Sequence, residues 1–374
     1  MKKRYIKISV VLATIIICLF FLFDRNLSND NSADAVHGIV VQTLQDKSLA
    51  AGSNTYGKVQ VKIISGDHKG QIVVIDNMIN DKTSHEAFAK KGDEVLLNID
   101  EDNSGHIKKA YMYEIVRYKI ILALGAFFVG LLALIGGKKG VKSILALIIT
   151  GAAVIKIIIP LTIIGFNPMI VSIIVCIVVS MINLIIISGK NKKTAAAIIG
   201  TVGGVIIAGI IAAVSINLLR LIGLTDEEAQ MLIYISQNTS FNFKGLLFAG
   251  MLMGALGAVM DVSMSIASSM DEIRKSNEEI STRDLIKSGM NVGKDIMGTM
   301  ANTLILAYAG GSMYVLMLMN SYNLSLLRTL NQDVMASEIV KTLSGSIGLI
   351  LTIPITAVAS AIIQNRNPKK QDYN

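Results

Sequence analysis

The sequence has little charge for its length. Charged residues make up 17% of its 374 residues, and apolar residues make up 52%. Soluble globular chains carry about 25% charged and about 45–50% apolar residues. Several apolar runs also approach or exceed the roughly 18 residues that cross the hydrocarbon core of a bilayer. This composition excludes a cytosolic enzyme and a disordered chain, and it predicts a polytopic α-helical membrane protein.

Cysteine and histidine are also scarce. The two cysteines, Cys18 and Cys176, lie inside apolar runs, where a cysteine packs as a small apolar residue, so a disulfide scaffold is excluded. The four histidines are widely spaced between His37 and His106, and neither H-E-x-x-H nor C-x-x-C occurs. We therefore expect no metal, no cofactor and no enzyme activity.

The first 35 residues predict a membrane anchor and a linker. Basic residues precede an apolar run from Ile6 to Phe23, and the polar stretch Asp24–Asp34 follows. A cleaved signal peptide is the alternative, but the run is long for one, and the nearest A-x-A, which begins at Ala33, lies well past its end.

Residues 36–117 change to short runs rich in Val, Ile and Tyr, with Gly, Ser, Asn and Asp between them. The five predicted strands are His37–Leu44, Lys58–Ser65, Gln71–Asn77, Asp93–Asp100 and His106–Ile115. Five short strands in this length predict a small β-barrel-like domain of OB or SH3 size.

Residues 118–365 predict a seven-helix membrane domain, which makes about eight transmembrane helices with the anchor. The seven are Lys119–Ile135, Val141–Ile159, Met169–Ile187, Ala195–Leu219, Leu246–Met270, Ile296–Met319 and Leu343–Ile363. Between the sixth and seventh of all eight, Asp271–Lys294 predicts a separate amphipathic helix at the membrane surface. Residues 366–374 form a tail.

The distribution of basic residues predicts the topology. With a cytoplasmic amino terminus, 18 Lys and Arg fall in inner segments, and four (Arg220, Lys244, Arg328 and Lys341) fall in outer loops after residue 117. Basic residues favour the cytoplasmic side, so we expect both termini inside a bacterial plasma membrane and the β domain outside. The same bias explains the net charge of +8, and no soluble basic patch indicates a nucleic-acid partner.

The predicted helix Leu246–Met270 carries the main candidate for function. Asp261 lies inside it, where a carboxylate costs at least about 2.5–3.5 kcal/mol. Helical spacing puts Gly254, Gly257, Ser265 and Ser268 on the same stripe. Such a stripe could guide a proton or a cation. The alternative is a buried polar cluster that only holds helices together, with the glycines allowing close packing.

The next helix offers partners for that carboxyl group. Asn302 and Thr303 lie at a similar predicted depth and could hydrogen-bond Asp261, and Thr299 continues the polar line. Farther out, Gly310 and Gly311 permit either close helix packing or a hinge. The basic residue Lys156 lies near the outer end of its span, and we expect it to reach the interface instead of pairing with Asp261.

The run GALGAVMDVSMSIASSMDEI, residues 254–273, resembles the signature of the YibE/F-like proteins, which are bacterial multi-pass membrane proteins. The layout is similar too, with an amino-terminal anchor, a small outer β domain and a multi-span block. The resemblance implies this architecture over nearly the whole chain.

A second resemblance is local. Gly257-x-x-x-Asp261, a Glu272-Ile273-Arg274 end and the following Thr299–Thr303 segment are similar to the proton-conducting half of SecD/SecF and of resistance–nodulation–division exporters. The spacing to Glu-Ile-Arg is about one turn longer here, and more spans separate the outer domain from the Asp helix. This resemblance implies a proton-coupling role for Asp261.

We therefore expect a transporter or export-assisting component in which Asp261 responds to protons or ions. The alternative is a membrane scaffold or sensor whose β domain binds a ligand or partner. The lipid bilayer is an expected partner in both cases, and a homodimer or a sister membrane protein would complete a half-exporter.

Overall fold

The computed structural model describes residues 36–44, 58–77, 89–102, 104–224, 231–232 and 241–365. The expected anchor and linker (1–35) and the tail (366–374) lie outside these residues. The chain divides into two compact units, Met1–Gly140 and Val141–Asn374, which are described separately.

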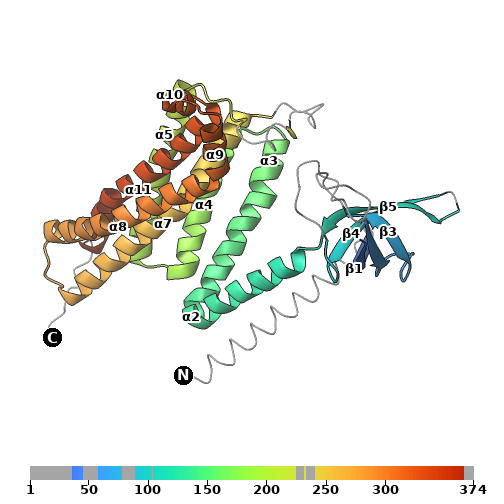
Figure 1. The fold of residues 1–374 in the computed structure, drawn as a ribbon. Coiled ribbons are helices and arrows are strands. Elements are labelled where there is room, and N and C mark those ends of the chain that lie inside the picture. The colour runs from blue at the N-terminus through green and yellow to red at the C-terminus, as the bar shows by residue number, and fades with distance from the viewer. Residues whose placement is uncertain are drawn as a thin grey trace, which may run out of the picture. The chain divides into compact units, whose positions relative to one another are not determined.

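The first unit contains a five-stranded antiparallel sheet (Figure 1). Its strands are β1 (Val36–Leu44), β2 (Lys58–Ile63), β3 (Ile72–Asp76), β4 (Glu94–Glu101) and β5 (Ile107–Ile115). They run in the order β3-β2-β1-β4-β5, and β3 also approaches β5, so the sheet is a nearly closed barrel. The five predicted strands and their barrel-like arrangement are thereby confirmed.

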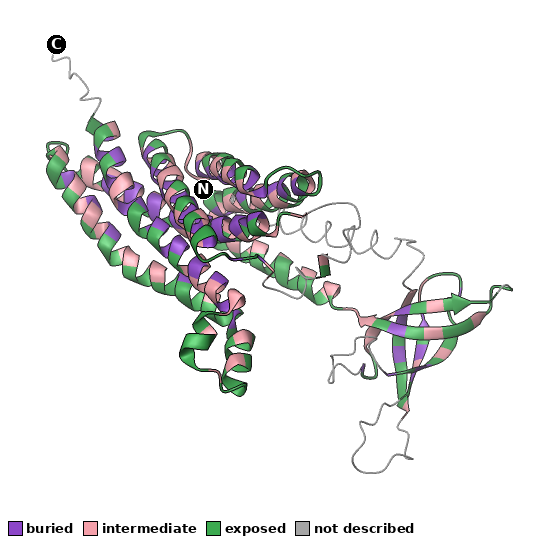
Figure 2. Cartoon of the chain, turned by 90° about the horizontal axis from the view of Figure 1, so that it is seen from above, coloured by how far each residue is buried: buried purple, intermediate pink, exposed green. Residues whose placement is uncertain are grey.

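The barrel forms because alternate side chains on each strand are apolar. Val59, Val61 and Ile63 on β2 are fully buried, as are Val95 and Leu97 on β4. These buried side chains form the core of the barrel, and along both strands they alternate with residues that are more exposed, as the burial colours in Figure 2 show.

Charged residues tie the barrel to the helix that follows it. In the first turn of that helix, Lys119 Nζ lies 2.7 Å from Glu94 Oε2 on β4. The other oxygen of Glu94 lies 3.1 Å from His37 Nδ1 on β1. In the β4–β5 turn, the backbone N–H groups of His106 and Ser104 donate to Asp102 and lower the pKa of its carboxyl. The ionised carboxylate thus supports this turn, and the support is lost as the pH falls through that lowered pKa.

A long apolar helical run follows the barrel. It comprises α2 (Tyr118–Ala153), the π-helix η1 (Val154–Ile158) and α3 (Ile159–Ile163). Gly137 has φ +53° and breaks the helical backbone of α2, within the predicted break between Ile135 and Val141. The run is 46 residues long, about twice the roughly 20 residues that one membrane span needs.

The second unit is a helical bundle (Figure 1). After η1 and α3 it contains α4 (Pro168–Ser188), α5 (Lys192–Leu218), α7 (Phe243–Ser276), α8 (Thr282–Gly311), α9 (Met313–Ser321), α10 (Leu326–Leu330) and α11 (Asp333–Asn365). Asparagine side chains cap three of these helices: Asn167 caps α4, Asn191 caps α5 and Asn242 caps α7.

Five helices in the described part of the chain are long and apolar enough to cross a membrane. The number rises to six if α8 and α9, which are bent by 57° at their junction, form one span. Eight spans were predicted. One of those lies in residues 1–35, and two of them correspond to the single run Tyr118–Ile163.

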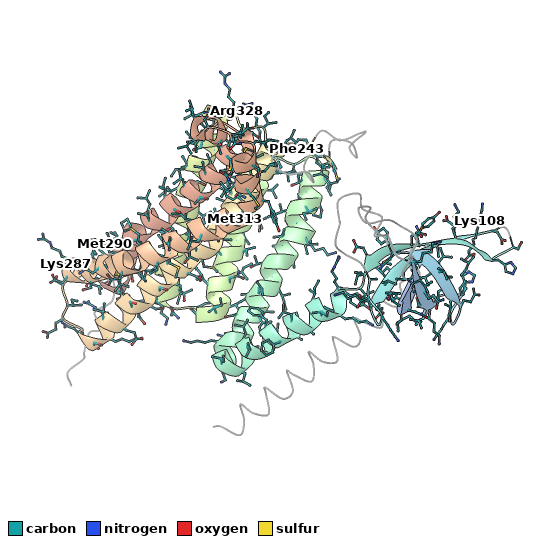
Figure 3. The ribbon with its side chains drawn as sticks, viewed as in Figure 1. Lys108, Phe243, Lys287, Met290, Met313 and Arg328 are labelled. Carbon is teal, nitrogen blue, oxygen red and sulfur yellow. The ribbon has the colours of Figure 1, made fainter. Side chains whose placement is uncertain are left out.

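The separate amphipathic helix predicted within Asp271–Lys294 is wrong. Instead α7 continues to Ser276 and α8 already begins at Thr282. Ser281 starts α8 because its hydroxyl accepts from the backbone N–H of Asp284 and donates to the Asp284 carboxylate at 2.7 Å. The charged segment therefore comprises the end of α7, a short turn and the first part of α8, where Figure 3 labels Lys287 and Met290.

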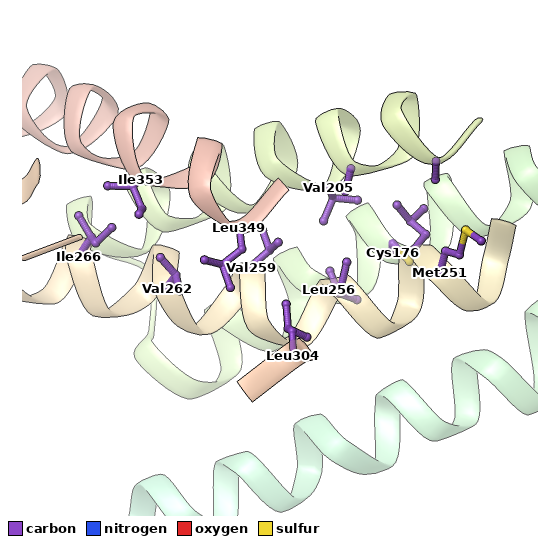
Figure 4. Packing of buried hydrophobic residues seen from close by; sticks show 14 of the residues in the cluster. Cys176, Val205, Met251, Leu256, Val259, Val262, Ile266, Leu304, Leu349 and Ile353 are labelled. Carbon is purple, nitrogen blue, oxygen red and sulfur yellow. The ribbon is translucent and has the colours of Figure 1, made fainter. Parts of the chain in front are cut away.

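The core of the bundle surrounds α7. This helix packs against α4, α5, α8 and α11. Val259, Val262 and Ile266 on its inner face are fully buried, and Leu349 and Ile353 of α11 pack in the same cluster (Figure 4). One face of α7 is thus fixed by apolar contacts, which decides where its polar residues lie.

Candidate functional site

Asp261 lies near the middle of α7, about 27 Å from the start and about 22 Å from the end of this 34-residue helix. It is exposed on the surface of the described bundle. Among the described residues it has no hydrogen-bond or ion-pair partner, and neither has Lys156, which is exposed in η1. The two opposite charges therefore do not form a pair.

The rest of the predicted stripe shares this exposed face. Gly254, Gly257 and Ser265 are exposed, and Ser268 is half-buried. The two glycines differ in their surroundings. A side chain at Gly254 would overlap the hydroxyl of Tyr308 on α8, whereas the space beside Gly257 is open to 4 Å. The close contact between α7 and α8 therefore explains why position 254 is a glycine, and it does not explain the glycine at position 257.

The candidate residues on α8 are exposed as well. Thr299, Asn302 and Thr303 all lie on its surface. The Thr299 hydroxyl donates to the Ile296 carbonyl at 2.9 Å, and that of Thr303 donates to the Thr299 carbonyl at 2.8 Å. The structure brings none of them into a hydrogen bond with Asp261. What it does bring together is two packed helices, α7 and α8, each with an exposed small and polar face.

Gly310 and Gly311 lie at the end of α8, next to the 57° bend into α9. Both are exposed, and within the described residues no neighbouring atom lies within 4 Å of the position of a side chain at either. Ser312 joins the two helices with φ −92° and ψ 10°. The two glycines therefore stand at a broken helix.

A cavity of about 200 Å³ opens beside this break. Tyr308 of α8, Ser312 at the junction and Val315 of α9 line one side, and α11 contributes the other. The α11 residues are Val334, Glu338 and Lys341. The continuous α8–α9 segment and the distant helix α11 thus line one space. It lies at the end of the bundle where α8 ends and α11 begins, and Figure 1 shows the place of these helices.

The polar groups of this cavity are arranged around a charge pair. Lys341 Nζ lies 2.5 Å from Glu338 Oε1 and 5.4 Å from the centre of the Tyr308 ring. The Glu338 and Lys341 side chains are 21% and 23% exposed. Ser312 is 7% exposed, and its hydroxyl makes no hydrogen bond with the described residues. A cation, a carboxylate and a spare hydroxyl therefore meet in a space that is partly shielded from solvent.

This cavity was not predicted from the sequence, because the last helix was expected to begin at Leu343 and Lys341 was expected in an outer loop. In the structure α11 begins at Asp333, so Glu338 and Lys341 are one turn apart on the same helix. The Glu-x-x-Lys spacing was the available signal, since residues three apart are neighbours on a helix. The contribution of Tyr308 had no sequence signal, because it depends on how α8 packs against α11.

The buried face of α7 carries hydroxyls of another kind. The Ser263 hydroxyl donates to the Val259 carbonyl within its own helix, and Thr356 of α11 does the same to Thr352. The Thr352 hydroxyl donates across to the Gly200 carbonyl of α5 at 3.3 Å. These residues are fully buried in close contact, which indicates helix packing and not a ligand site. In the described part of the chain, no three His, Cys, Asp or Glu residues lie together as a metal site.

Two family models match the chain. The model described as YibE/F-like protein matches residues 124–366, which include the whole bundle, and the model described as YibE/F family N-terminal domain matches residues 38–115, which form the barrel. No curated protein and no solved structure matches the chain. The two family matches agree with the two-part architecture and cover most of the sequence, and the chain belongs to the YibE/F-like family.

Proposed function

We propose that this protein is a bacterial plasma-membrane transporter or export-assisting component, with Asp261 as its proton- or cation-responsive group. The observation that carries the proposal is the position of Asp261, a carboxylate that has no partner among the described residues and is exposed at mid-length of an apolar helix. In hydrocarbon such a group is costly, so residues of this kind face water or another protein and mark ion pathways by default.

The surroundings of Asp261 support an ion pathway more than a structural role. A structural acid in a bundle would be paired within the core, and the core of this bundle lies on the opposite face of α7. Ser265 and Ser268 extend the polar face toward the end of α7 that carries Arg274 and Lys275. Hydroxyls in this arrangement offer oxygen contacts to a proton carrier or a cation.

The proposed topology has both termini in the cytoplasm and the barrel outside the cell. The support is the excess of Lys and Arg in the segments then placed inside, including Arg274, Lys275, Arg283 and Lys287 around the α7–α8 turn. The Ser265–Ser268 side of Asp261 then leads to the cytoplasm.

The proposal predicts that Asp261→Asn abolishes ion coupling in the full-length protein. The protein is reconstituted in vesicles with an internal pH dye, and proton or sodium flux is followed under an imposed gradient. The flux through the variant should fall to the level of empty vesicles. The reason is that an amide, unlike a carboxylate, neither takes up and releases a proton in this pH range nor holds a cation by charge.

Asp271→Asn is the matched control, because it makes the same change on the same helix at a residue paired with Lys275 at 2.8 Å. It should retain flux. Infrared difference spectra between buffers of different pH should lose one carboxyl band in Asp261→Asn and not in the control. Equal flux in folded wild type and Asp261→Asn would contradict the proposal.

A second candidate function, a scaffold or sensor, is favoured by an apolar patch on the barrel. Ile39 and Val41 on β1 and Ile72 and Val74 on β3 point outward and are 38–58% exposed. Because β2 lies between β1 and β3, these side chains form two short apolar rows on one side of the sheet, and exposed apolar surface of this kind is typical of partner-binding surfaces. Deleting residues 36–117 separates the two functions, because a scaffold loses all activity in the cell and a transporter keeps measurable flux.

A further inference from the structure

The cavity at the α8–α9 break has the chemistry of a ligand site. It combines an ammonium, a carboxylate, an aromatic face and a hydroxyl, supplied by Lys341, Glu338, Tyr308 and Ser312. These groups come from α8, α11 and the junction between α8 and α9, so no single helix creates the arrangement. We propose that this cavity binds a small zwitterion carrying one ammonium and one carboxylate or phosphate group.

The charges of the cavity are balanced, which selects against a ligand with a single charge. Glu338 and Lys341 neutralise each other at 2.5 Å. A lone anion would be attracted by the Lys341 ammonium and repelled by the Glu338 carboxylate. A lone cation would be attracted by Glu338 and repelled by Lys341. A ligand with both charges satisfies both side chains at once, and its own charges replace the contact between them.

The geometry assigns one end of the ligand to each side of the pair. The acidic group of the ligand accepts from Lys341 and from the Ser312 hydroxyl, which has no partner among the described residues. Ser312 also stands at the start of α9, and the amino-terminal end of a helix favours negative charge. The ligand ammonium donates to Glu338, in the place that Lys341 now occupies.

The broken helix supports the same assignment. Bent or discontinuous helices at membrane depth are tolerated where they line a cavity, and half-helix ends in transporters point at the charged groups of substrates. Here the 57° bend between α8 and α9 lies in the wall of the cavity, with Gly311 and Ser312 both lining it. A bound ligand would supply contacts for the groups at this break.

The size of the cavity limits the ligand. Its volume of about 200 Å³ is below the roughly 300–1,000 Å³ of pockets for drug-sized molecules. Val315 and Val334 line it with short aliphatic groups. A free amino acid with a small side chain fits these limits, and so does the ethanolamine headgroup of a phospholipid, which carries the same two charges.

The test is calorimetric titration of the purified full-length protein in nanodiscs of phosphatidylglycerol, a lipid without the ammonium. The probes are glycine, L-alanine, L-serine and L-valine, then glycerophosphoethanolamine. Ethylamine and propionate serve as half-ligands with one charge each. We expect saturable binding of at least one zwitterion, and binding at least about tenfold weaker for either half-ligand, because each leaves one partly buried charge unmatched.

Variants connect the binding to the cavity. Glu338→Gln and Lys341→Gln should each weaken binding by about tenfold or more. Val334→Phe should remove binding by filling the space while both charges remain. Glu272→Gln and Lys275→Gln are the matched controls, because they change another Glu–Lys pair three residues apart, at 3.0 Å on α7, and should bind as wild type.

The source of the ligand follows from which probe binds. Binding of an amino acid indicates a free solute, and binding of glycerophosphoethanolamine alone indicates a lipid headgroup. The proposal is overturned if folded wild-type protein binds no zwitterion, if propionate or ethylamine binds as tightly, or if the Glu338, Lys341 and Val334 variants all bind as wild type. Because binding is measured without a gradient, the result is independent of the proposed flux through Asp261.

Discussion

Single residues on one stripe of α7 have different surroundings, although their sequence spacing is the same. From the sequence, Gly254 and Gly257 are both interpreted as small residues that allow close helix packing. In the structure Tyr308 occupies the space that a side chain at Gly254 would fill, and nothing lies beside Gly257. A hydroxyl at the end of a rigid ring cannot move aside without turning the whole ring, so a side chain at Gly254 would displace Tyr308, which lines the cavity.

We predict that Gly254→Ala destabilises the protein by about 1–3 kcal/mol, the usual cost of overpacking. Gly257→Ala should be neutral or stabilising by up to about 1 kcal/mol, because alanine favours the helix and meets no neighbour. The measurement is thermal unfolding of the purified variants in detergent. The same pair of changes in a Tyr308→Phe background isolates the contact. If Gly254→Ala costs as much with Phe at 308 as with Tyr, the hydroxyl is not the cause.

At the scale of the secondary-structure elements, the close contact between α5 and α11 determines how the helices of the bundle pack. α5 and α11 approach closely where Gly204 faces Gly348, and a side chain at Gly204 would overlap the Thr352 hydroxyl. It would also lie 3.0 Å from the Gly348 carbonyl oxygen, which belongs to backbone and cannot move aside. The stripe of polar residues on α7 faces away from this contact because Val259 and Val262 on the other face already fill the core.

Gly204→Ala should therefore lower stability by about 1–3 kcal/mol. The neighbouring Gly203→Ala is the control, because the three atoms nearest to a side chain there belong to the flexible Ile355 side chain of α11, which can move aside, and the nearest lies at 2.9 Å. Both changes add the same methyl group to the same helix beside α11, so their difference reports the closer approach of Gly204 to the Thr352 hydroxyl and the Gly348 backbone. Equal unfolding temperatures for the two variants would show that α5 and α11 are packed no more closely at Gly204 than at Gly203.

At the scale of the whole molecule, the chain combines a β-barrel unit with a bundle of helices long enough to cross a membrane. Most basic residues of the bundle lie in the segments at the end that holds the α7–α8 turn, and the proposed cavity lies at the end where α8 stops. Under the proposed topology, this arrangement places the cavity toward the outside and the basic turn in the cytoplasm.

Substituted cysteines test that topology in intact cells. The starting protein carries Cys18→Ser and Cys176→Ser, and single cysteines are then placed at Ser104 in the barrel and at Ser276 at the end of α7. A membrane-impermeant maleimide should label Ser104→Cys directly and Ser276→Cys only after the membrane is opened. Labelling of both without opening, or in the reverse order, would refute the assigned orientation.

The sequence by itself determined the local structure of this protein. The predicted ends of the five strands differ from the observed ends by two residues at most. Strands are predicted this well because turn residues and β-branched runs act over a few neighbours along the chain. The two helices between Met169 and Leu219 were predicted because each is an apolar run long enough to cross a bilayer. The helices α7, α8 and α11 extend beyond the apolar runs that predicted them, because charged residues such as Glu272 and Lys341 continue each helix past its apolar part.

Only the tertiary structure decided which face of each helix is buried and which residues meet. Periodicity put Asp261, Ser265 and Gly257 on one stripe, but packing against α5 and α11 turned that stripe outward. The cavity needs Tyr308, Ser312 and Lys341 from elements that meet only when α8 bends and α11 packs beside it. Local propensity cannot encode such a meeting, because it depends on the free energy of packing surfaces that lie far apart in the chain.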